Sequence, residues 1–119
     1  MQFFMTAKSF SKRQLQIGEE IRRHTAIELN ELVNTRIDGD FLTIMKAETS
    51  KDLRYAKIFF RCKIENREKY DELLNSVAVD ISRILYKKLH LRVLPNITFI
   101  FDDTLLAIDE INRVVSENS

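Results

Sequence analysis

Apolar side chains occupy every second position from Tyr55 to Lys63, and this alternation constrains the fold more than any other feature of the chain. A strict period of two places one set of side chains on a buried face of a β-strand and the other set toward solvent. The inward set is Ala56, Ile58, Phe60 and Cys62, and the outward set is Tyr55, Lys57, Phe59 and Arg61. The preceding segment, Phe41–Glu48, is predicted to be a partner strand joined through a tight polar turn. Other elements must therefore cover the inward face of this hairpin.

Two helical regions can provide that cover. Ser11 is expected to cap a helix from Lys12 to about Val33, because a serine oxygen accepts hydrogen bonds from the free amides of a first turn. Glu28 interrupts the apolar stripe of this helix, and its carboxylate is expected to reach solvent or a cation. The second region, Arg67–Leu89, repeats apolar residues at spacings of three and four. Its centre, Val77–Asp80, could host a bend, although no proline or glycine forces one there.

The C-terminal part adds a third strand and a short helix. Pro95 ends a connection, Ile97–Phe101 is predicted to be a strand, and Thr104 is expected to cap a helix that runs from Leu105 to about Ser116. The predicted fold class is therefore α+β, with helices on one face of a three-stranded sheet. A chain of 119 residues suits one domain, and we expect a monomer.

Glycine and cysteine usage excludes several classes of function. With glycine only at positions 18 and 39, the chain has neither a dinucleotide fingerprint nor a phosphate-binding loop. Cys62 is the single cysteine, so no intrachain disulfide forms, and one cysteine with two histidines shows no zinc-ligand spacing. No apolar run approaches the roughly 18 residues that span a bilayer, and the N-terminal residues make a poor signal peptide. We expect a cytoplasmic protein with no cofactor, no bound metal and no membrane association.

Asp102 and Asp103, directly after the third strand, form the acidic pair that could act as a catalyst or hold a metal. Such a pair far more often caps a turn or the next helix, and no second cluster of acids or histidines converges on it. We therefore predict that the protein is not an enzyme, with metal-dependent RNA cleavage at this pair as an alternative. His24 and His90 are interpreted as ordinary surface or edge histidines.

The basic residues are the chemistry that remains. Residues 1–63 carry 12 basic and 8 acidic side chains, whereas residues 93–119 carry one and five. Clustered cations neutralise phosphate without reading sequence. The candidates for phosphate contact are Lys12, Arg13, Lys51, Arg54, Lys57, Lys87, Lys88 and Arg92. Tyr55 and Phe59 lie among cations on the outward face, which suits single-stranded or irregular RNA and equally suits a solvated face.

Two blocks of sequence carry a family resemblance. Residues 50–59 read Ser-Lys-Asp-Leu-Arg-Tyr-Ala-Lys-Ile-Phe, and residues 91–99 read Leu-Arg-Val-Leu-Pro-Asn-Ile-Thr-Phe and lead into Asp102-Asp103-Thr104-Leu105. With a weaker match at Ser11–Ile17, the chain resembles the bacterial ribosome-binding factor A family over about residues 9–113. The resemblance implies a type II KH-like fold in the order α-β-β-α-kink-α-β.

The same resemblance implies a cytoplasmic, non-catalytic assembly factor of the small (30S) ribosomal subunit. The family binds the immature subunit late in maturation, supports processing of the 5′ end of 16S rRNA and is associated with growth in the cold. The implied partners are this subunit, its rRNA and other assembly factors on the subunit. The alternative function is a small protein-interaction module that binds a partner through the open sheet face.

Three departures from the family pattern accompany the match. Ala78-Val79-Asp80 lacks the glycine of the family's helix kink, Asn34-Thr35-Arg36 stands at its Asp-Pro-Arg turn, and the tail has Ile108 and Glu110 where a glycine and a basic residue are usual. The expected organisation is an N-terminal extension at 1–8, a KH-like ribosome-binding domain at 9–103 and a C-terminal tail at 104–119 that forms a short helix.

Overall fold

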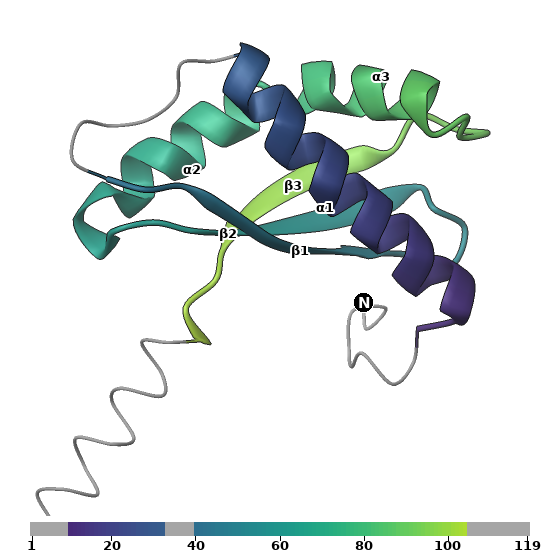
Figure 1. Ribbon diagram of the computed structural model, residues 1–119, viewed down its shortest axis with the longest axis horizontal. Coiled ribbons are helices and arrows are strands. Elements are labelled where there is room, and N and C mark those ends of the chain that lie inside the picture. Colours follow the sequence, from purple (N-terminus) through teal and green to yellow (C-terminus); the bar gives the residue numbers. More distant parts are fainter. Residues whose placement is uncertain (1–9, 33–39, 105–119) are drawn as a thin grey trace, which may run out of the picture.

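Helices cover one face of a three-stranded sheet (Figure 1). The structure is a computed structural model that describes residues 10–32 and 40–104. The elements are α1 (Lys12–Leu32), β1 (Thr43–Thr49), β2 (Tyr55–Arg61), the 3-10 turn η2 (Ile64–Asn66), α2 (Arg67–Ser76), α3 (Ala78–Lys88) and β3 (Asn96–Phe101). The predicted element order is confirmed over these residues. The predicted extension at 1–8, the end of the first helix at Val33 and the final helix from Leu105 lie outside the described residues.

The sheet has the strand order β1-β2-β3. β1 is antiparallel to β2, and β2 is parallel to β3, so the chain crosses over through α2 and α3 before it pairs with β2 again. A β-bulge lies between Ile44 and Lys46. Ile44 pairs with Phe60 and Ala47 with Ile58, and both pairs lie on the covered face, because the bulge inserts one residue into the alternation of β1.

The predicted inward face of β2 is confirmed as the centre of the core. Ile58 and Phe60 are fully buried against Tyr70, Leu74, Ile81 and Leu85 of the second helical region. The ring of Phe60 meets Phe101 edge to face, with 5.8 Å between centroids. Burial, together with the nearby carboxylate of Asp40, raises the pKa of the Cys62 thiol to about 11. Cys62 is therefore a packed thiol rather than a nucleophile, as its position in the alternation predicted.

Ser11 caps α1 as predicted, and the cap also ties the helix to the sheet. The backbone amide of Gln14 donates to Ser11 Oγ at 3.1 Å, and the amide of Ser11 donates to Gln14 Oε1 at 2.9 Å. This reciprocal pair is a capping box. The side-chain nitrogen of Gln14 donates in turn to the carbonyl of Thr49 at 2.7 Å, within a buried environment. One side chain thus fixes both the start of α1 and its position against the end of β1.

Gly18 lets α1 approach β1 closely. A Cβ atom at this position would lie 2.5 Å from the carbonyl oxygen of Ala47, a rigid backbone atom of the strand. Glycine inside a helix normally destabilises it by about 1 kcal/mol relative to alanine. The close packing of helix on strand is the reason that the residue is needed here.

The second helical region breaks at Val77 without a glycine. Val77 has φ −103° and ψ 5°, and its amide donates to the carbonyl of Leu74 at 3.2 Å. The hydroxyl of Ser76 donates to the carbonyl of Leu73 at 2.6 Å, so it takes the acceptor that Val77 would use in a continuous helix. The bend that the sequence left open is therefore present, and a serine hydroxyl favours it.

Asn75, at the end of α2, holds the edge strand β3. The amide of Phe99 donates to Asn75 Oδ1 at 3.0 Å, and Asn75 Nδ2 donates to the carbonyl of Phe99 at 3.2 Å. The side chain thus occupies backbone groups of β3 that a neighbouring strand would otherwise bind.

The C-terminus of α3 closes in a Schellman motif. The amide of Leu91 donates to the carbonyl of Tyr86 at 3.1 Å, and the amide of His90 donates to the carbonyl of Lys87 at 3.4 Å. His90 occupies the left-handed position of this motif with φ 52°. Glycine is the usual residue at such a position, because a Cβ atom is strained there.

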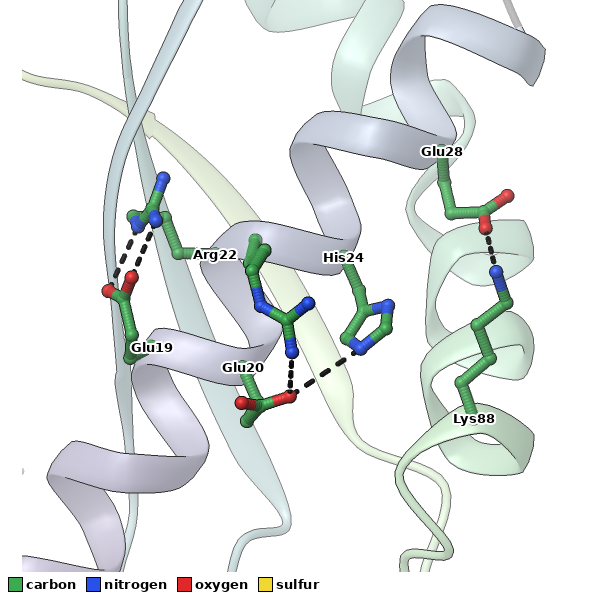
Figure 2. Close-up of polar contacts among 7 residues, drawn as sticks. Glu19, Glu20, Arg22, His24, Glu28 and Lys88 are labelled. Carbon is green, nitrogen blue, oxygen red and sulfur yellow. Dashed lines mark hydrogen bonds and ion pairs between the residues drawn. The ribbon is translucent and has the colours of Figure 1, made fainter.

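An ion pair joins α1 to α3 (Figure 2). The Glu28 side chain is buried, and its Oε1 lies 2.5 Å from the ammonium of Lys88, which is half exposed. The predicted cation partner of Glu28 is therefore Lys88. Figure 2 also shows the exposed Glu19–Arg22 pair within α1. A second exposed pair of this helix, Glu20–Arg23, has the same spacing of three residues. Exposed pairs of this kind contribute little to stability. Both also lie within α1, whereas the Glu28–Lys88 pair joins α1 to α3 and helps to hold the two helices together.

Gly18→Ala is expected to lower the free energy of unfolding by about 1–3 kcal/mol, because the added methyl group meets the Ala47 carbonyl. Urea denaturation measures the change. Gln16→Ala, at an exposed position of the same helix, is the matched control and should change stability by less than about 0.5 kcal/mol. A Gly18→Ala protein as stable as the wild type would contradict the close packing of α1 on β1.

His90→Gly is expected to raise the free energy of unfolding by about 1 kcal/mol, because glycine adopts the left-handed conformation without strain. His90→Ala keeps the Cβ atom and should leave stability nearly unchanged. Thermal unfolding of the two variants separates backbone strain from the histidine ring. Equal melting temperatures for the glycine and alanine variants would show that His90 is not strained.

A double-mutant cycle with Glu28→Gln and Lys88→Met is expected to give a coupling of about 1 kcal/mol, because one partner is buried and the other is half exposed. The Lys88→Met variant alone should be the less stable single variant, since it leaves a buried carboxylate without its cation. Chemical denaturation at low and high salt measures the coupling. A coupling near zero would mean that α1 and α3 are held by apolar packing alone.

Candidate nucleic-acid interface

The turn between β1 and β2 is built around Ser50 and Asp52. The amide of Leu53 donates to the carbonyl of Ser50 at 3.0 Å, and Leu53 takes a left-handed conformation with φ 61°. Asp52 Oδ1 accepts from Ser50 Oγ at 2.7 Å and from the amide of Arg54 at 3.1 Å. The bond from Ser50, followed by that from Arg54, lowers the pKa of Asp52. Asp52 and Leu53 therefore build the tight polar turn that the sequence predicted between the two strands.

A hollow of about 360 Å³ lies where this turn meets the start of α1 and the connection from α3 to β3. We call it the basic hollow. Its walls are Arg13 and Ile17 of α1, residues 51–53 of the turn and residues 89–93 of the connection. The structure thus brings together three cations that are far apart in the sequence, namely Arg13, Lys51 and Arg92, and all three are exposed.

The five other predicted cations do not line the hollow. Lys12 and Lys87 are exposed on α1 and α3 but do not line it. Arg54 is exposed in the same turn, with its Nε 3.6 Å from Asp52 Oδ2. Lys57 lies on the open face of the sheet, opposite Glu48 in the strand register. Lys88 pairs with Glu28.

The sequence indicated neither the apolar floor of the hollow nor that His90 lines it. His90, interpreted as an ordinary surface or edge histidine, is exposed and lines the basic hollow between the helix end and Arg92. Ile17 and Leu89 line the same hollow and pack against the core. The one available signal was that His90 lies within residues 81–92, which contain four basic and no acidic side chains.

The open face of the sheet carries the outward residues of β2, as the alternation predicted. The ammonium of Lys46 lies 4.9 Å from the centre of the Phe59 ring and 3.1 Å from Glu48. At the other end of the strand, Arg61 donates to Asp102 at 3.0 Å. Lys46 and Arg61 are therefore engaged within the protein. Tyr55, at the start of the strand, is 47% exposed.

Asp102, the first residue of the acidic pair after β3, accepts hydrogen bonds from Arg61 and Thr104 and so has a structural role. Partial burial raises the pKa of this carboxyl, but hydrogen bonds from Thr104 and the charge of Arg61 outweigh it, and the net pKa is lowered. Its Oδ1 accepts from both the amide and the hydroxyl of Thr104, at 3.0 and 2.6 Å.

Within residues 10–32 and 40–104, no group of three histidines, cysteines or acids could hold a metal ion. No helix in the same ranges is long and apolar enough to cross a membrane.

The basic hollow has the features of an anion site on a rigid support. Arginine and lysine side chains from three elements face one concavity, and arginine can bind two phosphate oxygens at once. An apolar floor below them gives room for a sugar or base edge. The arrangement can bind phosphate groups.

A family model described as ribosome-binding factor A matches residues 13–115. Among relatives, the ribosome-binding factor A proteins of Burkholderia cenocepacia (strain HI2424) and Burkholderia ambifaria (strain MC40-6) are each 29% identical over 108 residues, covering 88% of this chain and 79% of the relative. The match therefore spans nearly all of the described fold.

Two solved structures are similar in fold. The crystal structure of ribosome-binding factor A from Thermus thermophilus has a TM-score of 0.64 at 21% identity, over 73% of this chain and 93% of that one. The solution structure of Thermotoga maritima protein TM0855 has a TM-score of 0.67 at 30% identity, over 77% and 89%. The type II KH-like fold expected from the sequence is thereby confirmed. By its sequence and its fold, the chain belongs to the ribosome-binding factor A family.

Proposed function

We propose that this ribosome-associated factor binds the immature small (30S) subunit and supports late maturation of its 16S rRNA, including processing of the 5′ end. Family membership supports association with the ribosome. The named subunit, the maturation step and a role in cold growth are carried over from the resemblance. The factor would act in the cytoplasm as a monomer, beside other assembly factors on the subunit.

The observation that carries the proposal is the basic hollow. Arg13, Lys51 and Arg92 come from three separate elements, and the fold brings them to one concavity. Cations scattered over a solvated surface would not converge in this way. A convergent set can neutralise adjacent phosphates and release their counterions, which gives affinity without sequence readout.

The mechanism we propose is positioning without catalysis. The turn and the Schellman motif hold Lys51 and Arg92 on fixed backbone, so phosphates bound there are held in one arrangement. Arg54, Lys57, Lys87 and Lys12 would extend the charged surface around the hollow. Lys88 would contribute after release from Glu28, and this contribution is the weakest of the set because the pair must first open.

The alternative function is a protein-interaction module on the open sheet face. It would use Tyr55 and Phe59 to dock a protein partner. The ammonium of Lys46 lies over the Phe59 ring, and charged residues are depleted at the core of protein interfaces, so this face is a poor match for a protein-docking surface. The two functions differ in salt dependence, since phosphate contacts weaken steeply with salt and apolar contacts do not.

The double variant Lys51→Glu, Arg92→Glu is expected to bind immature small subunits at least about tenfold more weakly than the wild type. It should also lower the slope of log affinity against log salt by about 1.4, because two phosphate contacts are lost. Co-sedimentation over a salt series measures both quantities.

The double variant Lys63→Glu, Lys69→Glu, at exposed positions away from the hollow, changes the net charge by the same amount; it is the control and should bind nearly as the wild type does. Unchanged affinity and slope in the Lys51→Glu, Arg92→Glu variant would remove the basic hollow as the RNA site. Binding that is insensitive both to salt and to these substitutions would favour the protein-interaction module.

A further inference from the structure

The basic hollow is lined by two sets of side chains that differ in exposure and in chemistry. One set is aliphatic and half-buried, and it forms the floor of the hollow: Ile17, Leu53, Leu89, Leu91 and Val93. The other set is polar or charged and exposed, and it forms the rim: Arg13, Lys51, Asp52, His90 and Arg92. The proposed function uses the cations of the rim and gives the floor no role.

The cations of the rim are not neutralised within the described part of the protein. No ion pair among the described residues includes Arg13, Lys51 or Arg92. Among the described residues that line the hollow, Asp52 is the one acid, and its carboxylate lies 3.6 Å from the Nε atom of Arg54, outside the hollow. The rim therefore carries an excess of positive charge, which attracts anions.

The floor is held in place by the packing and the backbone of the elements around it. Ile17 and Leu89 pack against the core, and the amide of Leu89 donates to the carbonyl of Leu85 at 2.9 Å. In the turn, the amide of Leu53 donates to the carbonyl of Ser50 at 3.0 Å. A site that is formed before its ligand arrives loses little conformational freedom on binding.

A ligand that fits both sets of side chains has negative charge on one side and apolar surface on the other. A nucleotide has this character, because its phosphate suits a cationic rim and a face of its base suits an aliphatic floor. The volume of about 360 Å³ lies at the lower end of the range for sites that enclose small ligands, roughly 300–1,000 Å³. The hollow therefore has room for about one nucleotide.

Base pairing decides whether an RNA can use the floor. Within an RNA helix, neighbouring bases cover the base faces, so a concave protein surface meets mainly phosphates and sugars. An unpaired nucleotide can leave the stack, and its base can then enter the hollow while the flanking phosphates stay at the rim. Removing about 60 Å² of apolar surface from water in this way is worth roughly tenfold in affinity.

We propose that the basic hollow takes one unpaired nucleotide of an RNA strand, with its base on the aliphatic floor and the neighbouring phosphates at the rim. The site therefore selects RNA that presents an unstacked nucleotide over RNA that is fully paired. This inference rests on the proposed function of the hollow as an RNA site.

The test measures affinities of the full chain for three labelled RNA duplexes by fluorescence anisotropy. One duplex carries a single bulged uridine, the second carries an abasic residue at the bulge, and the third is fully paired. The wild type is expected to bind the duplex with the bulged uridine roughly tenfold more tightly than the abasic one, because only the first has a base for the floor. The fully paired duplex should bind as weakly as the abasic one.

Leu91→Asn makes one floor position polar and should remove most of the preference for the bulged uridine, while the affinity for the abasic duplex stays unchanged. Leu94→Asn is the matched control, because Leu94 is exposed in the same connection and does not line the hollow. It should retain the full preference. Val93→Thr keeps the branched shape of a second floor residue and should also lower the preference, which guards against a folding defect in Leu91→Asn.

Equal binding of the bulged and abasic duplexes by the wild type would overturn the inference, and the hollow would remain a phosphate site. A full preference for the bulged uridine in both floor variants would also overturn it, since the base would then be bound elsewhere. If the Lys51→Glu, Arg92→Glu variant binds all three duplexes as the wild type does, the proposed function itself fails.

Discussion

The fold depends on the junction formed by residues 49–55. The carbonyl of Thr49 accepts from Gln14, which fixes α1, and Ser50 closes the hairpin through both the amide and the carbonyl of Tyr55. The carbonyl of Arg54 accepts from Asn96 and so attaches the start of β3. Four elements therefore meet within seven residues. Because the same residues carry Lys51, the structural junction and the wall of the basic hollow are one piece of backbone.

The break in the second helical region has a comparable effect at the β3 edge of the sheet. Ser76 ends α2, and Asn75, one residue earlier, binds the backbone of Phe99. α3 then runs to its Schellman motif, which turns the chain at His90 and brings Arg92 to the hollow. Left-handed residues at Leu53 and His90 thus stand on two walls of the same hollow. Strain of this kind often collects at functional sites, because the surrounding structure holds the backbone there.

The sequence predicted most of the fold because the strongest patterns coincide with the most buried elements. The alternation from Ala56 to Cys62 is the buried face of β2, and Ser11 caps the first helix. The family resemblance supplied the KH-like topology, which periodicity alone did not. The bulge near Met45 was beyond prediction, because a one-residue insertion leaves no clear signal in a single sequence. The sequence placed a possible bend at Val77–Asp80, but it did not indicate that the Ser76 hydroxyl would favour the break.

The candidate site was predictable only as a set of charges. The sequence pattern identified eight cations. Which of them meet at one hollow depends on the tertiary fold, and the sequence pattern does not contain that information. Arg13 and Arg92 lie in distant parts of the chain and line one hollow, whereas Lys88, near Arg92 in sequence, is drawn to Glu28 on α1. His90 is an exposed histidine, as interpreted, but nothing in its residue type indicated that it lies on the wall of a hollow.

The central claim is that the basic hollow is where this factor holds small-subunit rRNA. Crosslinking of the protein to RNA in cells, read at nucleotide level in the RNA and at peptide level in the protein, tests it most directly. If the hollow binds this RNA, crosslinks should concentrate on precursor 16S rRNA and on peptides that contain residues 50–55 and 89–93. Crosslinks spread over unrelated messages, or confined to peptides from α2, would contradict it.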